Sequence, residues 1–173
     1  LAQMNDGSPY AELIFCEIVM QHLVDAGMTF EPVVCHFKSK VGNANLRLSG
    51  YAISEEADQL DLFVSLYQGF EAPTPVQDQD SKIAAQQCVR FLELCALGRL
   101  ADKLDPSTEA YTLALTIQEI YSGLEQVRVF VLTDGIAKSK SFKPREIGGK
   151  SVYLEVKDIE RLFRHRSEGK PRD

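Results

Sequence analysis

The segment from Gly50 to Gln68, which reads GYAISEEADQLDLFVSLYQ, constrains the fold more than any other part of the chain. Its apolar residues alternate on both sides of an acidic turn, and a period of two predicts two neighbouring strands. The second strand carries one carboxylate, Asp61, on a face that it shares with aromatic and hydroxyl side chains. A charge inside a strand is costly unless it lies at a sheet edge, in a cleft or beside a partner. Asp61 is therefore the first candidate for chemistry, and Arg47 on the preceding strand is a candidate partner for a purely structural pair.

The composition is that of an ordinary globular domain. The chain has 173 residues, of which 45% are hydrophobic and 25% are charged, and this length is enough to bury one core. We therefore expect residues 1–173 to form a single domain. No apolar run approaches the roughly 20 residues of a membrane-spanning helix, and the N-terminus lacks the pattern of a signal peptide. The chain is expected to be cytoplasmic, and its Leu start and polar basic end favour a piece of a longer protein.

The charge distribution limits the kinds of partner. A net charge of −6 argues against broad binding of nucleic acid through a strongly positive surface. Positive charge nevertheless gathers in the last quarter of the chain, in the C-terminal tail and in one loop that contains Lys138, Lys140, Lys143 and Arg145. This loop is a candidate contact for nucleic acid, and the alternative is a solvated loop without a ligand.

The cysteines and histidines show no metal-binding spacing. Cys16, Cys35, Cys88 and Cys95 lie within apolar patterns and form no C-x-x-C pair, and the three histidines are dispersed. We expect buried free thiols and no metal cage built from these residue types.

Periodicity and turn residues predict the remaining elements. A first helix begins at Ser8-Pro9 and ends at Gly27, and its apolar residues surround almost the whole circumference, so we expect it to be buried on more than one side. The predicted strands are 32–37, 46–53, 60–68, 126–133 and 151–156, and the predicted later helices are 81–100, one opened by Asp105-Pro106, and 158–166. The order αββ(β)ααββα indicates an α/β fold, α+β-like, with a mixed sheet flanked by helices.

Three segments in this order resemble one bacterial family: GYAISEEADQLDLFVSLYQ, VRVFVLTDG and VYLEVKDIERLFR. Together they resemble the N-terminal region of the abortive infection phage resistance (AIPR) proteins, over nearly the whole chain. The resemblance implies a role in antiviral defence and a further C-terminal region, since members of the family are longer. It assigns no active site.

The element order is also similar to a second scaffold, the restriction-endonuclease-like core of PD-(D/E)XK nucleases. That chemistry needs acidic ligands for Mg²⁺ and a nearby lysine. Asp61 and Glu17 are the candidate metal ligands. The usual E-x-K is absent from the strand of Asp61, and the nearest match is Glu155-Val156-Lys157 at the end of the last strand. Under this reading Glu155 and Lys157 join Asp61 and Glu17 as catalytic residues.

Two hypotheses follow. In the first, the chain is a sensing, docking or assembly module of a phage-defence protein, without a cofactor, whose partners are the C-terminal region of the same protein or a second copy of itself. In the second, it is a Mg²⁺-dependent nuclease acting on DNA or RNA, intact or degenerate. The second requires a carboxylate of another residue within about 5 Å of Asp61, in a cleft with a lysine. Pairing of Asp61 with an arginine would argue against it.

Overall fold

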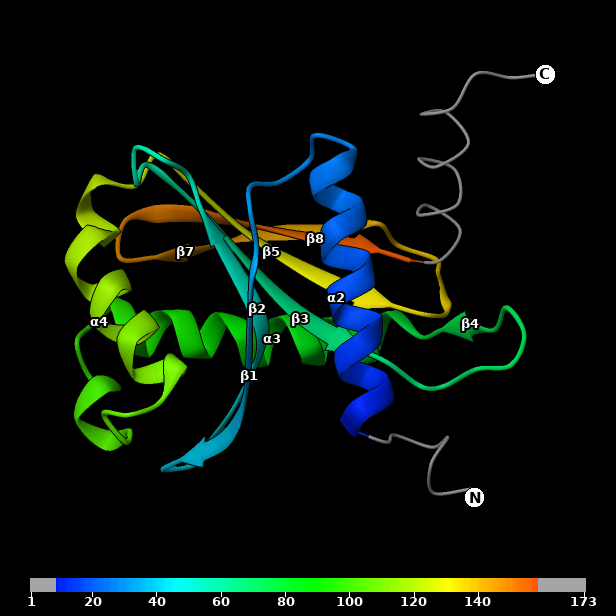
Figure 1. The fold of residues 1–173 in the computed structure, drawn as a ribbon, viewed down its shortest axis with the longest axis horizontal. Helices are drawn as coiled ribbons and strands as arrows, with labels where there is room; N and C mark the ends of the chain where they lie inside the picture. The colour runs from blue at the N-terminus through cyan, green and yellow to red at the C-terminus, as the bar shows by residue number, and fades with distance from the viewer. Residues whose placement is uncertain (1–8, 159–173) are drawn as a thin grey trace.

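A six-stranded mixed sheet with helices on both faces forms the centre of the molecule (Figure 1). The computed structural model describes residues 9–158. Its elements in chain order are α2 (Pro9–Asp25), β1 (Val33–Val41), β2 (Ala44–Ile53), β3 (Gln59–Leu66), β4 (Pro75–Val76), α3 (Asp78–Ala96), η1 (Ala101–Lys103), α4 (Glu109–Ile120), η2 (Tyr121–Gly123), β5 (Gln126–Thr133), β6 (Ile136–Ala137), β7 (Ser141–Ile147) and β8 (Lys150–Lys157). The predicted α/β class is confirmed.

The strand order is β1-β2-β3-β5-β8-β7. Strands β1 to β3 form an antiparallel meander, β3, β5 and β8 are mutually parallel, and β7 returns antiparallel to β8 at the edge. Strand β5 is central and pairs with β3 over its whole length. Central parallel strands are buried on both faces, which is why QVRVFVLT is apolar almost throughout. A separate pair of short parallel strands, β4 and β6, lies beside this sheet.

The larger core lies between the sheet and helices α3 and α4. Helix α3 presents Ala84, Cys88, Phe91, Leu92 and Cys95 to the sheet, and all of them are buried. This is the stripe that helical periodicity predicts. Helix α4 packs on α3 and on β1 and so covers the end of this face.

The smaller core lies on the opposite face, under α2. It joins Cys16, Val19, Met20 and Leu23 of the helix to Ala52, Phe63, Phe130 and Leu132 of the sheet. A Cβ at Gly50 would come 2.7 Å from Sδ of Met20, so a glycine in β2 permits the close approach of the helix. The expectation that α2 is buried on more than one side is wrong, because Tyr10 and Ile18 on its outer face are 70% and 63% exposed.

Strand β7 is the main element that the sequence did not predict. Its residues were expected to form a Lys-rich loop, and Pro144 lies within it. A proline cannot donate to a sheet and is confined to edge strands, and β7 is an edge strand. The pairing register with β8 shifts between Phe142 and Arg145, which accommodates the proline. The short strands β4 and β6 were also not predicted.

Several helix boundaries differ from the expected ones, including the start of α3 at Asp78 instead of residue 81, and one predicted helix lies outside the described residues. Helix α3 ends at Ala96 because Gly98 takes a left-handed conformation with φ of +70°. Asp105 caps a turn through the backbone N–H of Ser107, and α4 begins later, with Thr108 as its N-cap. The predicted final helix, apart from its first residue, lies beyond residue 158. Among the described residues no helix is long and apolar enough to cross a membrane.

Candidate functional site

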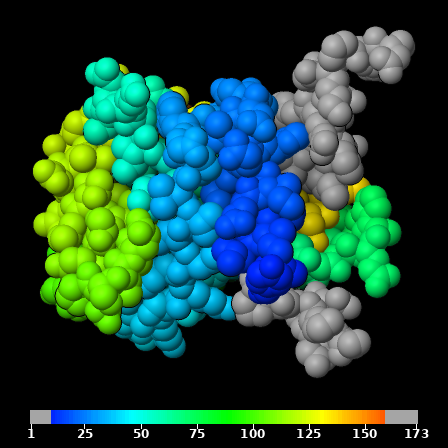
Figure 2. Space-filling model, viewed as in Figure 1, coloured from blue at the N-terminus to red at the C-terminus, as the bar shows by residue number. Residues whose placement is uncertain are grey.

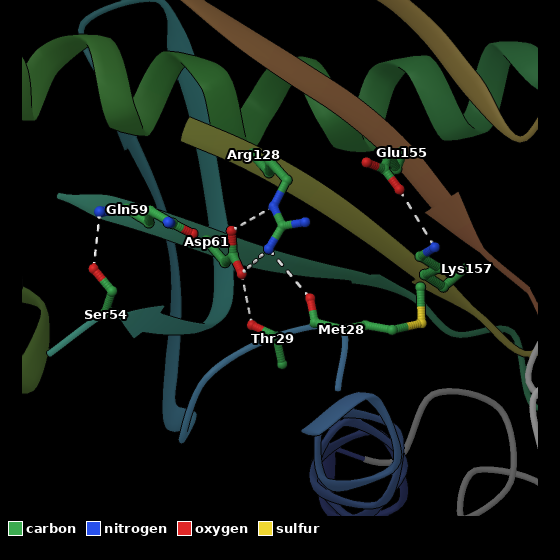
Figure 3. A network of polar contacts seen from close by, with 8 residues as sticks. All are labelled: Met28, Thr29, Ser54, Gln59, Asp61, Arg128, Glu155 and Lys157. Carbon is green, nitrogen blue, oxygen red and sulfur yellow. Dashed lines mark hydrogen bonds and ion pairs between the residues drawn. The ribbon is translucent and has the colours of Figure 1, made fainter. Parts of the chain in front are cut away.

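A buried ion pair on the α2 side of the sheet contains the principal candidate residue. Asp61 of β3 lies beside Arg128 of β5 in the parallel register. Nε of Arg128 donates to Oδ1 of Asp61 at 2.9 Å, and Nη2 donates to Oδ2 at 2.8 Å (Figure 3). The side chain of Asp61 is completely buried, while that of Arg128 is 20% exposed. The geometry is the two-point pairing that a guanidinium makes with a carboxylate.

The loop between α2 and β1 completes this pair. Oγ1 of Thr29 donates to Oδ2 of Asp61 at 2.6 Å, and the backbone oxygen of Met28 accepts from Nη2 of Arg128 at 3.2 Å. Both carboxylate oxygens of Asp61 therefore have donors. Burial raises the pKa of Asp61 above its usual range, and the hydrogen bonds from Arg128 and Thr29 oppose that shift.

The structural partner of Asp61 is Arg128 and not the expected Arg47. Arg47 donates to the backbone oxygen of Ser65, and its Nη2 lies 3.7 Å from Oε2 of Glu12 on α2. The hydroxyl of Ser65 donates to the same carboxylate. Arg128 is the one charged residue in QVRVFVLT, and the signal that could have identified it was a single opposite charge in each of two buried strands.

Glu155 and Lys157 lie on the same face of the sheet as Asp61. They project from β8, and Nζ of Lys157 lies 3.3 Å from Oε1 of Glu155. Lys157 is 3% exposed, and its Nζ lies 5.7 Å from the ring centroid of Phe130. The guanidinium carbon of Arg128 lies 5.0 Å from the same centroid, so both cations contact the ring of Phe130. The prediction that Glu155 and Lys157 share one face is confirmed.

This arrangement does not fit a two-carboxylate Mg²⁺ site. Strand β5 lies between the strands of Asp61 and Glu155, and two strand spacings amount to roughly 9.5 Å. Arg128 occupies the side of Asp61 that faces Glu155's strand. Glu17 is exposed on the outer face of α2, and Glu12 is the α2 carboxylate that faces the sheet. Within residues 9–158 no cluster of three or more His, Cys, Asp or Glu side chains could hold a metal ion.

A second set of carboxylates lies at the carboxyl ends of the parallel strands, where α/β proteins often bind ligands. Asp134, directly after β5, accepts from the backbone N–H groups of Gln68, Gly69 and Phe70 at 2.9 to 3.0 Å. The Asp-Gly pair at 134–135 therefore anchors the loop after β3. The carboxylate of Asp134 therefore binds backbone N–H groups of the same chain.

Asp158, directly after β8, has a similar role. Its Oδ2 accepts from the backbone N–H of Ala137 at 2.6 Å and from Nζ of Lys140 at 2.7 Å. It is completely buried. Of the four cations predicted to contact nucleic acid, Lys140 is thus part of an internal ion pair, while Lys138, Lys143 and Arg145 are exposed.

All four cysteines are free and buried, as predicted. Burial is the main cause that raises the pKa of Cys16 and of Cys35 to about 11. Thiols of this kind are mostly protonated at neutral pH and are poor nucleophiles.

Comparison with known proteins gives one match. Residues 15–164 match the family model described as the abortive infection phage resistance protein N-terminal domain. No curated protein and no solved structure matches the chain. The match covers nearly all of the sheet and helices described above, and it agrees with the resemblance that three sequence segments carry.

Proposed function

The chain belongs to the abortive infection phage resistance (AIPR) family, and on that premise we propose that it is a docking module, which binds the C-terminal region of its own protein through the outer face of α2. Membership indicates a role in phage resistance. The matched family model describes an N-terminal domain, and domains of one chain commonly pack on one another through a surface interface.

The observation that carries this proposal is an exposed apolar stripe on α2. Tyr10, Ile14 and Ile18 are 70%, 37% and 63% exposed. They are spaced four residues apart, so they lie on one face of the helix. Figure 2 shows α2, in blue, at the surface of the molecule. We refer to these three residues as the α2 stripe.

The rest of α2 explains why the stripe is unusual. The opposite face of the helix is filled by the smaller core, so the fold of this domain does not require apolar residues on the outer face. A surface helix in a globular protein normally carries charged or polar residues there. Contiguous exposed apolar residues mark surfaces that bind another protein, and a helical stripe is the pattern of a helix packed against a partner.

The paired state of Asp61 supports a module without catalysis. Its carboxylate is held by Arg128 and Thr29, which is the outcome expected of a structural residue. One observation favours the alternative Mg²⁺-dependent nuclease, namely that Asp61, Glu155 and Lys157 share one face of the sheet. The carboxylates of Asp61 and Glu155, however, lie on strands separated by β5. Since this separation is too large for one shared Mg²⁺ ion, we favour the docking module.

The test is a binding titration between residues 1–173 and the separately produced C-terminal region of the same protein. Isothermal titration calorimetry should detect a complex with the unchanged domain. Ile18→Asp should weaken it at least tenfold, because a carboxylate in an apolar interface is desolvated. The matched control is Leu115→Asp on α4, where the side chain is 42% exposed and belongs to another surface; it should leave affinity unchanged.

Two results would contradict the proposal. One is the absence of a complex, and the other is an equal loss of affinity in the Leu115→Asp control.

Sedimentation velocity of residues 1–173 alone should show a monomer. A dimer that Ile18→Asp disrupts would instead assign the α2 stripe to a second copy of the chain.

A further inference from the structure

A polar groove lies on the outer side of α3, on the face of the sheet opposite α2. It has a volume of about 470 Å³ and is bounded by the turn of the β1–β2 hairpin, by α3 and by β7. Its lining residues are Asn43, Ala44, Asn45, Ile83, Gln86, Gln87, Arg90 and Arg145. We refer to it as the α3 groove. Since the α2 stripe lies on the other side of the sheet, the two surfaces are independent.

The α3 groove is lined by basic and carboxamide side chains, although acidic residues outnumber basic ones in the whole chain. The whole sequence has 25 acidic and 19 basic residues, yet no carboxylate lines the groove, which contains two guanidinium groups and four carboxamides. Guanidinium groups pair with phosphate through two parallel hydrogen bonds. Carboxamides both donate and accept, and they match the edges of nucleobases, which also carry donors and acceptors side by side.

One carboxamide in the groove lacks a partner. Oε1 of Gln87 is buried and accepts no hydrogen bond within the described structure. A buried acceptor without a donor costs free energy. Because Oε1 has almost no exposed surface, a ligand N–H group would reach it after the Gln87 carboxamide rotates into the groove that this residue lines. Ile83 beside it is 45% exposed and provides an apolar surface for a base.

Further cations lie around the groove. Lys40 pairs opposite Asn45 in the hairpin, and Lys143 lies two residues before Arg145 in β7; both are exposed. Arg90 forms one ion pair, from Nη1 to Oε1 of Glu93 at 2.9 Å. Its side chain is 44% exposed, and the guanidinium has five N–H donors in all. The α3 groove therefore has a positively charged lining, although the net charge of the whole chain is negative.

We propose that the α3 groove binds single-stranded nucleic acid, with Arg90 and Arg145 on phosphates and the carboxamides on base edges. Its volume lies in the range of roughly 300–1,000 Å³ typical of sites for small ligands, so it takes a nucleotide or two and not a duplex. An acidic peptide also pairs with arginines and donates backbone N–H groups, but it offers no planar base to lie against the exposed Ile83. Of the four cations expected from sequence to contact nucleic acid, Arg145 alone lines the groove.

The test is fluorescence anisotropy of residues 1–173 with labelled mixed-sequence 12-nucleotide single strands. Single-stranded DNA or RNA should bind, and binding should weaken as salt rises. Arg145→Glu should weaken it roughly tenfold or more, since it removes a charge-assisted hydrogen bond and adds repulsion. The matched control is Arg99→Glu, which makes the same charge change at an exposed residue outside the groove, and it should weaken binding by less than about threefold.

A second variant separates recognition from folding. Gln87→Leu removes the unpaired acceptor, so it should weaken binding without lowering the melting temperature. Comparison of DNA with RNA identifies which single strand the groove prefers. The proposal is overturned if neither strand binds, if Arg99→Glu weakens binding as much as Arg145→Glu, or if a duplex or a polyglutamate peptide binds as tightly as the single strands.

Discussion

Arg128 holds the carboxylate of Asp61 by two hydrogen bonds, of 2.9 and 2.8 Å, across two adjacent parallel strands. Through Thr29 and the backbone oxygen of Met28, the same pair fastens the loop between α2 and β1 to the sheet. The pair therefore links α2, which carries the proposed docking surface, to the central strands.

Loss of either charge should destabilise the fold. Asp61→Ala leaves Arg128 without its carboxylate, and removal of one partner of a buried pair costs about 3 kcal/mol of unfolding free energy. Urea denaturation measures this loss. The double variant Asp61→Leu with Arg128→Leu should be more stable than either Asp61→Leu or Arg128→Leu alone, because it leaves no unpaired charge. A double variant whose loss equals the sum of the two single losses would show that the residues do not interact.

We expect that mutation of the candidate nuclease residues does not change any metal-dependent cleavage of nucleic acid by this protein. Single-stranded and double-stranded DNA and RNA would be incubated with residues 1–173 and with the full-length protein, in Mg²⁺ or Mn²⁺. Any cleavage should be equal in the unchanged protein, in Asp61→Ala and in Glu155→Gln. Glu155 is the cleaner probe, because it is not part of the pair that fastens the α2–β1 loop. Loss of cleavage in a folded Glu155→Gln variant would instead support the nuclease hypothesis.

Gly135→Ala should be strongly destabilising. A Cβ at this position would lie 2.2 Å from Cγ2 of Val76 and 2.8 Å from the backbone oxygen of Thr74, so β4 would have to move. Overpacking of this kind costs roughly 1–3 kcal/mol of unfolding free energy. Gly123→Ala is the control, because a Cβ there meets no atom within 4 Å. Equal urea midpoints for the two variants would contradict the close contact.

The pH dependence of stability should contain a contribution from Tyr121. Its hydroxyl donates to the backbone oxygen of Ile147 at 2.6 Å, and burial, with a smaller effect of Glu146, raises the pKa of Tyr121 to about 12. The unfolded value is about 10. Because the folded pKa is the higher one, the stabilising contribution is fully present below pH 10 and is lost as pH rises towards 12.

Urea midpoints of the unchanged chain and of Tyr121→Phe, measured from pH 8 to pH 11, would check this. The difference between the two should be constant up to about pH 9 and should shrink at higher pH. Tyr153→Phe is the control, because Tyr153 is 47% exposed. A difference that stays constant to pH 11 would contradict the raised pKa of Tyr121.

Local patterns in the sequence predicted much of the fold. The period of two in β2 and β3 and the apolar run of β5 predicted three central strands, and the stripe of α3 predicted its buried face, because these patterns depend on residues close together in the chain. Strand β7 was not predicted, since Pro144 and its charged neighbours are acceptable in a strand only at a sheet edge. That position is a property of the assembled sheet.

For the candidate site too, the sequence predicted some features and the tertiary structure was needed for others. By itself the sequence determined that a carboxylate at position 61 would lie on one face of its strand and would need a sheet edge, a cleft or a partner. Only the tertiary structure decided that the partner is Arg128, which is 67 residues away, and not Arg47 in the adjacent hairpin. It also brought the hairpin turn, α3 and β7 around one groove. The physical reason is that parallel pairing joins strands through long crossovers, so its register depends on the packing of the whole sheet and not on the residues nearby in sequence.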